Sequence, residues 1–218
     1  AAVAMPSGLS QACLPAAVID VAVPPQVPMH LIEAEDVIRD QQDQPLRFAI
    51  PHATNLTPST RGTWEHLNDH RMLWRLRVHS PNAAHLNLGF DHLALPRSAM
   101  LSIYSLDGHT ILPVQTQRTL TGGAWWTPII PGDELVIEIE MDTADRSAVE
   151  AGVLLTSINH GYRGFKAAAD RGSSEACNID VVCPEGDDWW NEIASVGVYT
   201  VQGSWTCSGF MVNNTTHR

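Results

Sequence analysis

Apolar and polar residues alternate with a period of two along much of residues 45–160, a spacing that predicts β-strands with one buried face. In the clearest case, from Met72 to Val78, apolar residues alternate with arginines. Glu138 and Glu140 also alternate with apolar residues, so their carboxylates are expected to point outward. The strand candidates, separated by Gly, Pro and Asn turns, are residues 72–78, 84–90, 99–104, 111–114, 124–130, 134–141 and 153–158. Short strands at roughly ten-residue spacing, without a competing long amphipathic helix, predict an all-β fold: an antiparallel β-sandwich of jelly-roll or immunoglobulin type.

The chain changes character on both sides of this region. Residues 1–44 are expected to form an extended lead-in, because their first thirty residues are rich in Ala, Val and Pro. Residues 161–171 carry Gly, Ala and basic residues without periodicity, which indicates an exposed, cleavable linker. Residues 172–218 contain two further strand candidates, 194–201 and 206–212. Because two strands do not make a stable core, this last part is expected to begin a second domain whose remainder lies elsewhere.

Composition and charge exclude several classes of function. The formal net charge is −11, which disfavours partners such as nucleic acids and anionic membranes. The sequence has no apolar run of membrane-spanning length and no phosphate-binding or zincin motif. We expect no cofactor and no metal site. His66 and His70 could share one face of a short helix and hold a metal there, but surface histidines are common.

Four cysteines bear on the cellular compartment. Cys177, Cys183 and Cys207 crowd together near the end of the sequence, whereas Cys13 stands alone near its start. The spacing is unlike that of a zinc site and favours a disulfide framework formed in an oxidising compartment. Three half-cystines cannot close among themselves, so either Cys13 reaches them or their partners lie on other polypeptide. The small residues Ala1 to Ala4 fit a mature N-terminus left by signal-peptide removal as well as an arbitrary start of the sequence.

One segment carries a specific resemblance. The run from Cys177 to Asp187, CNIDVVCPEGD, followed by ASVGVY at 194–199 and CSGFMVNNT at 207–215, closely resembles the start of the mature lysyl endopeptidase family. These are secreted bacterial serine proteases with the chymotrypsin double-barrel fold. Residues 60–142 resemble the N-terminal pro-region of the same family. The matching pieces include Gly62-Thr63-Trp64, Trp74-Arg75-Leu76, Leu86-Asn87-Leu88, Tyr104, Trp126-Thr127 and Gly132-Asp133-Glu134.

The resemblance implies a function and a maturation site. It implies the N-terminal portion of a secreted or periplasmic serine-endopeptidase zymogen that cleaves after basic residues, with a pro-domain that keeps the protease inactive, assists its folding, or both. Family mature chains begin five residues before the first cysteine, which places the activation cut at Arg171–Gly172. The residue before that cut is Arg rather than Lys, so Arg acceptance is expected. The catalytic Ser, His and Asp are expected downstream, and no catalytic residue is assigned within this sequence; this polypeptide alone should be inactive.

The resemblance also implies partners. The three clustered cysteines match family half-cystines whose own partners lie further downstream. Arg218 is expected to be either a second cleavage point or simply where the sequence ends. If it is a nick, the remainder of the protease domain would be a second polypeptide, held through disulfides from Cys177, Cys183 and Cys207 and through strand pairing. Protein substrates are the other expected partners.

A competing hypothesis treats the sandwich as a binding module for carbohydrate or for a protein surface, attached to a protease. Trp64, Trp74, Trp125 and Trp126 could stack on sugar rings if their faces were exposed. Each is also a candidate core residue, because Trp74 alternates with arginines and one of the adjacent pair must face inward. Binding of the isolated 45–160 segment to glycans, with no effect on the protease, would favour the binding module.

Overall fold

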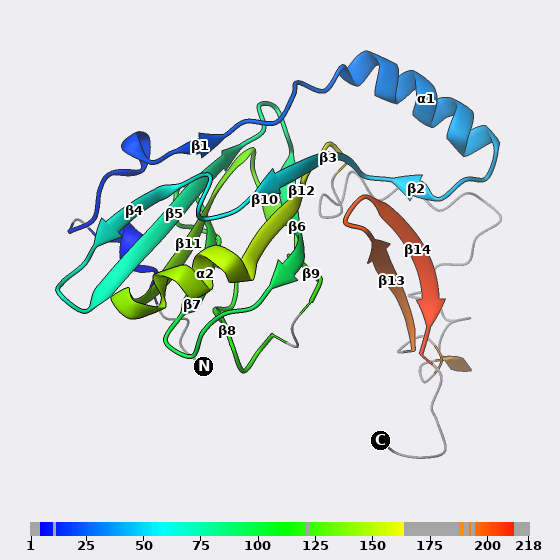
Figure 1. The fold of residues 1–218 in the computed structure, drawn as a ribbon. Coiled ribbons are helices and arrows are strands. Elements are labelled where there is room, and N and C mark those ends of the chain that lie inside the picture. The colour runs from blue at the N-terminus through cyan, green and yellow to red at the C-terminus, as the bar shows by residue number, and fades with distance from the viewer. Residues whose placement is uncertain are drawn as a thin grey trace.

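A computed structural model describes residues 5–10, 12–120, 123–163, 188–189, 192 and 195–211, and all structural statements below refer to these residues. They form two β-sheets stacked face to face, and a separate hairpin beside them (Figure 1). The first sheet has the order β1 (Val21–Ala22), β5 (Arg71–His79), β11 (Glu134–Asp142), β7 (Met100–Ser105), β8 (Gln115–Thr116), with β4 (Thr63–His66) also paired to β5. The second has the order β10 (Ile130–Pro131), β6 (His85–Leu93), β12 (Val153–Gly161), β3 (Ala49–Leu56), with β9 (Trp125–Trp126) paired to β6.

The hydrophobic core lies between these two sheets. Leu76 and Ile137 from the first sheet and Leu88 and Ile158 from the second belong to one cluster of buried residues, as does Trp74. The arginines of β5 lie at its outward positions, as the period-two alternation predicts, together with Leu73 and His79. The predicted all-β, sandwich-like fold is therefore confirmed.

A third, small sheet joins the N-terminal and C-terminal parts of the chain. Its order is β13 (Val196–Val201), β14 (Trp205–Phe210) and β2 (Leu46–Arg47), all antiparallel. Two of the strands are those expected at 194–201 and 206–212. The described residues in this region form a hairpin and no closed barrel.

The expectation of an extended lead-in over residues 1–44 is wrong for one stretch, where Met29–Gln41 form the helix α1. Pro24, Pro25 and Pro28 keep the preceding chain extended, whereas the residues after Pro28 contain neither Gly nor Pro and can form a helix. Composition averaged over the lead-in hides this change. The other helical elements are short: α2 (Arg146–Gly152) and the 3₁₀ turns η1 (Ser7–Leu9), η2 (Ala16–Val18) and η3 (Thr143–Asp145).

Other details of the prediction also differ from the structure. Residues 111–114 contribute a single bridge from Ile111 to Tyr104 instead of a strand. The candidate 124–130 is split into β9 and β10 around Pro128, which has no amide hydrogen to donate to a ladder. His66 ends strand β4, so it does not share a helix face with His70. Among the described residues, no helix has the length and hydrophobicity needed to span a bilayer.

The outer face of the first sheet is charged but covered. Arg75 and Glu138 are direct cross-strand partners, and their exposed fractions are 1% and 2%. The N-terminal segment (residues 5–10 and 12–22) crosses this face: the Gly8 N–H donates to Glu138 Oε2 at 3.0 Å, and Arg75 Nη2 donates to the Leu14 carbonyl at 2.8 Å. The carboxylate of Glu138 therefore points outward as predicted, but it contacts protein instead of water.

Candidate functional site

The C-terminal hairpin, β13–β14, is bound to the N-terminal part of the chain through strand pairing. Strand β2 extends its sheet by one strand, with Arg47 opposite Trp205 and Leu46 opposite Thr206. The next residue continues the contact, because the Phe48 N–H donates to the Ser204 carbonyl at 2.9 Å. An isolated two-stranded hairpin is marginally stable in water, so a third strand supplied by the sandwich stabilises it.

The turn of the hairpin rests on the outer face of the second sheet. Asn87 Nδ2 donates to the Gly203 carbonyl at 3.1 Å, and Asn159 Nδ2 donates to the Gln202 carbonyl at 3.3 Å. Both asparagines are almost fully buried, at 2% and 0% exposure. Their amide groups therefore depend on the turn for these hydrogen bonds, since a buried donor left unpaired costs about 1–3 kcal/mol.

Gly203 fits this contact for two reasons. Its φ is +62°, a conformation that residues with a side chain rarely adopt. A Cβ atom at this position would also lie 2.6 Å from Asn87 Nδ2 and 3.0 Å from Trp126 Cε3, closer than side chains approach one another. The turn can therefore approach the second sheet closely only because residue 203 is a glycine.

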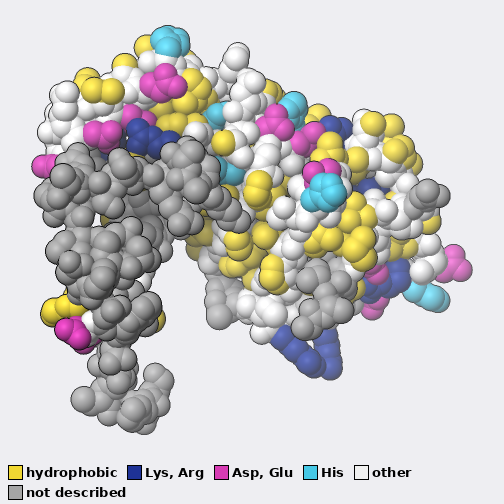
Figure 2. All heavy atoms as spheres, turned by 180° about the vertical axis from the view of Figure 1, so that it is seen from behind, with side chains coloured by type: hydrophobic (Ala, Val, Ile, Leu, Met, Phe, Trp, Pro, Cys, Tyr) yellow, Lys and Arg dark blue, Asp and Glu magenta, His cyan; other side chains and the backbone are white. Residues whose placement is uncertain are grey.

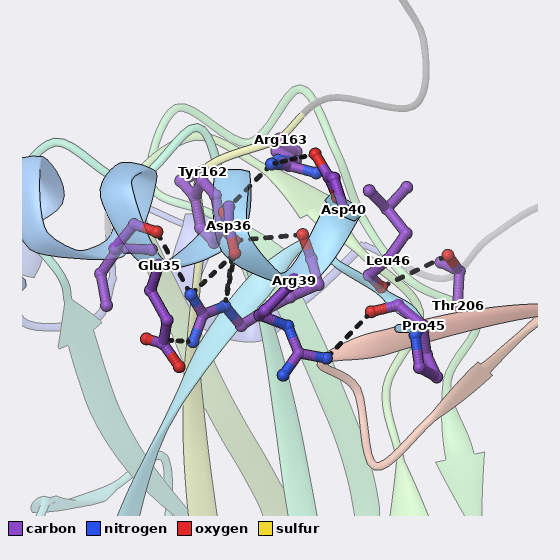
Figure 3. Close-up of polar contacts among 11 residues, drawn as sticks. Glu35, Asp36, Arg39, Asp40, Pro45, Leu46, Tyr162, Arg163 and Thr206 are labelled. Carbon is purple, nitrogen blue, oxygen red and sulfur yellow. Dashed lines mark hydrogen bonds and ion pairs between the residues drawn. The ribbon is translucent and has the colours of Figure 1, made fainter. Parts of the chain in front are cut away.

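Two arginines contact the ring of Trp205, the first residue of β14. The guanidinium carbons of Arg39, in the last turn of α1, and Arg47, in β2, lie 4.3 and 5.9 Å from the centre of the Trp205 ring. Arg39 Nη2 also donates to the Pro45 carbonyl at 3.1 Å, which orients the side chain (Figure 3). We refer to all contacts of Arg39, Leu46, Arg47, Phe48, Asn87 and Asn159 with the hairpin as the docking interface.

The buried carboxylate of Asp36 binds Arg47 of this interface and two residues that follow β12. Asp36 is 3% exposed, and Arg47 Nη2 donates to its Oδ1 at 2.7 Å. Its Oδ2 accepts hydrogen bonds from the Tyr162 hydroxyl at 2.6 Å and from Arg163 Nη2 at 3.1 Å (Figure 3). One carboxylate thereby connects α1, β2 and the end of β12. Seen from behind, acidic side chains gather around a basic one over α1 (Figure 2).

Helix α1 has an unusual orientation as a result. Its buried residue is Asp36, whereas Leu31, Val37 and Ile38 are more than half exposed. The polar side of the helix faces the sandwich because that is where its ion-pair partners lie. Hydrophobic burial therefore does not explain the position of α1, and the Asp36 contacts do.

The prediction of an exposed linker from residue 161 is wrong for its first three residues. Gly161 is the last residue of β12, so it is not part of an exposed linker. The N–H groups of Tyr162 and Arg163 both donate to the Phe48 carbonyl, at 3.1 and 3.3 Å. Burial, followed by the hydrogen bond to Asp36, raises the pKa of Tyr162 to about 12, so its hydroxyl keeps its proton and donates at neutral pH. Tyr162 and Arg163 are therefore bound to the N-terminal part of the chain.

Most of the site residues expected from the sequence cannot be placed. Arg171, Gly172, Cys177, Cys183 and Arg218 lie outside the described residues. Cys207 lies in β14 and is half-buried, and Cys13 lies in the N-terminal segment, where its thiol donates to the Ser7 carbonyl at 3.2 Å. These two described cysteines are not joined in a disulfide. Within the described residues, no three His, Cys, Asp or Glu side chains are grouped as a metal site.

The four tryptophans do not form an exposed platform. Trp74 is 2% exposed, and Trp64 and Trp125 pack against the core cluster. Trp126 is 37% exposed, but it lies over Gly89 and next to the turn of the hairpin. The ring arrangement that the binding-module hypothesis needs is therefore absent from this part of the molecule.

The two parts of the chain that meet in the docking interface match the family models of two different domains. A family model described as the lysyl endopeptidase N-terminal domain matches residues 23–155. A second, described as the lysyl endopeptidase C-terminal domain, matches residues 171–218. The chain belongs to the lysyl endopeptidase family. Strand β2 and Asn87 lie within the first match and the hairpin within the second, whereas Asn159 lies just beyond the end of the first match. The docking interface therefore joins parts of two lysyl endopeptidase domains. The family places the chain among peptidases and their precursors.

Sequence reasoning missed the residues that form this interface. Asn87 and Asn159 do leave a signal, because asparagine is unfavourable in β-strands. Asp36 and Arg39 leave none, since charged residues on a helix are usually solvated. The role of Arg39 depends on Trp205 and that of Asp36 on Tyr162 and Arg163, which are all far away in the sequence.

Proposed function

We propose that the N-terminal domain is the pro-domain of a secreted serine endopeptidase that cleaves after basic residues, and that it acts as a folding template for the protease. In this proposal the catalytic triad lies further along the precursor than Arg218. The bond between Arg171 and Gly172 is the activation site, and its hydrolysis separates template from enzyme. The remainder of the protease domain packs on the hairpin that the template presents.

The observation that carries the proposal is the third strand that β2 adds to the hairpin. Val196, Tyr199, Val201, Phe210 and Met211 of the C-terminal part are all at least 40% exposed. A hairpin with so much exposed apolar surface would aggregate or remain unpaired on its own. When the hairpin is docked, β2 and the two asparagines set its register before any other part of the protease packs on it. A template of this kind lowers the entropic cost of closing long-range strand pairs.

The test compares two glycine substitutions in the same hairpin, made in the complete precursor. Gly203→Ala introduces a Cβ against Asn87 and forces an unfavourable φ, whereas Gly197→Ala places its Cβ in open space. We expect Gly203→Ala to lower the yield of active enzyme, assayed on Lys and Arg ester substrates, by at least about tenfold. Gly197→Ala should leave that yield within about a factor of two.

Two further readouts identify the cause. The mass of the released fragments reports whether the cut follows Arg171 or Lys166, the only lysine in the sequence. Cleavage after Lys166 would overturn the assignment of Arg171. Equal yields from the two glycine variants would overturn the template role, because the hairpin would then fold without the docking interface.

A further inference from the structure

Three basic residues, Arg163, Lys166 and Arg171, follow β12 before the C-terminal domain proper. A protease that cuts after basic residues has to distinguish among them. Arg163 lies within the described residues, whereas Lys166 and Arg171 lie outside them. The surroundings of Arg163 therefore show how accessible the peptide bond after this residue is to a protease.

The side chain of Arg163 is held by helix α1. Its Nη2 lies 3.1 Å from Asp36 Oδ2 and 4.0 Å from Asp40 Oδ2 (Figure 3). Asp36 is buried and also binds Arg47, so it cannot move toward solvent with Arg163 without breaking the docking interface. The guanidinium would have to leave this carboxylate before another protein could bind it.

The main chain of Arg163 is held as well. Its N–H donates to the Phe48 carbonyl at 3.3 Å, and its carbonyl oxygen lies 2.9 Å from His85 Nε2. Because a carbonyl can only accept, His85 Nε2 carries the proton and donates. His85 is 4% exposed and packs so closely on Gly161 that any side chain there would overlap the imidazole ring. The histidine is therefore fixed against the carbonyl that precedes the Arg163–Gly164 bond.

Serine proteases require both of these groups. The side chain before the cut has to enter a specificity pocket, and the carbonyl carbon has to meet the nucleophile while its oxygen enters the oxyanion hole. Hydrolysis then adds one water, leaving a carboxylate on Arg163 and an amine on Gly164. A cut there would also leave residues 164–171 in front of Gly172.

We propose that Asp36 and His85 lock Arg163 against cleavage and so confine maturation to the basic residues that follow it. This inference rests on the proposed function and concerns the regulation of the same precursor. Asp36 thus has two tasks, because it anchors β2 in the docking interface and withholds Arg163 from the protease.

The test is limited proteolysis of the 218-residue chain with trypsin, which cuts after Arg and Lys. Arg118, exposed in a loop, serves as the internal reference. We expect the cut after Arg163, measured by mass spectrometry, to be at least about tenfold slower than the cut after Arg118 in the unmodified chain. Asp36→Asn should remove most of that difference. The matched control is Asp40→Asn, which removes the 4.0 Å pair of an exposed carboxylate and should change the ratio by less than about twofold.

A second variant separates the lock from loss of the fold. His85→Leu removes the donor to the Arg163 carbonyl and leaves Asp36 in place. It should also speed the cut after Arg163, while hydrogen exchange at Leu88 reports that the sandwich persists. Rapid cleavage after Arg163 in the unmodified chain would overturn the lock, as would an unchanged ratio in both variants. Since trypsin supplies the cleavage, neither result depends on the template role, which is measured by the yield of active enzyme.

Discussion

The guanidinium carbon of Arg39 lies 4.3 Å from the centre of the Trp205 ring, so the last turn of α1 covers an aromatic residue of the C-terminal hairpin. A cation over an indole face contributes about 0.5–2 kcal/mol, depending on how far the pair is desolvated. The contact thus joins two domains by an interaction that either domain alone lacks.

A double-mutant cycle measures this contact. Arg39→Met and Trp205→Leu should each weaken docking, with a coupling energy of about 0.5–2 kcal/mol. The readout is hydrogen exchange at the Phe48 amide, which donates to Ser204 in the hairpin. The matched control is Arg146 over Trp64, a similar pair at 4.5 Å that is remote from the hairpin. Zero coupling in the first cycle, or equal effects from both pairs, would contradict the assignment.

Removal of Arg47 should be costly. The Arg47→Met variant leaves Asp36 with a single arginine partner in a buried position, and breaking a buried ion pair costs about 3–5 kcal/mol. We expect the free energy of unfolding to fall by about 3 kcal/mol, the lower end of that range, because Arg163 and Tyr162 still bind the carboxylate. Urea denaturation measures the loss. As a comparison, Glu150→Gln breaks an exposed pair with Arg146 and should cost less than about 0.5 kcal/mol.

Stability should fall in mild acid because of three histidines. Burial lowers the pKa of His52, His85 and His160 below the usual 6.5, and for His160 the charges of the other two add to the effect. Folding therefore favours the neutral rings. Their contribution is fully present above pH 6.5 and is lost as the pH falls below it toward the folded-state pKa.

Denaturation at a series of pH values checks this. Each fully shifted histidine lowers stability by up to about 1.4 kcal/mol per pH unit in that window. His160→Phe should reduce the slope, whereas replacing the exposed His109 should not. A flat profile between pH 7 and about pH 5 would mean that the three rings ionise freely in the folded protein.

Attachment of the N-terminal segment should depend on Gly8. A Cβ at this position would lie 2.7 Å from the Tyr104 hydroxyl and 2.8 Å from Arg75 Cδ. Gly8→Ala should therefore detach the segment and expose Cys13, whose pKa is now raised by burial. Alkylation of Cys13, followed by peptide mass spectrometry, should become at least about tenfold faster. Met5→Ala, at a residue that is 71% exposed, should leave the rate unchanged.

Most of the longer strands of the sandwich could be predicted because their pattern is local, whereas β3 and β4 were not among the predicted strands. From Met72 to Val78 and from Glu134 to Met141 successive residues alternate sides, so the period indicates which side chains face the core, although it does not show that the outward Arg75 and Glu138 are covered by the N-terminal segment. Helix α1 escaped prediction because its buried side is charged and its exposed side contains Leu31 and Ile38, the reverse of the usual pattern.

The docking interface could not be predicted for a different reason. Asn87, Asn159 and Asp36 acquire their roles from residues that lie up to 127 positions away, and no spacing within one segment encodes such a pairing. Family resemblance located the two domains and the expected cut at Arg171. It gave no indication of which side chains hold the domains together.

Thr206 pairs with Leu46 across a separation of 160 residues. At a synthesis rate of about 5–20 residues per second, β2 leaves the ribosome roughly ten to thirty seconds before its partner strand. Asn159 precedes Gln202 by 43 residues, so the last strand of the sandwich is also made before the turn that it binds. Because the sandwich is synthesised first, its surface has had time to form when the hairpin leaves the ribosome. The order of synthesis is therefore sufficient to set the order of assembly.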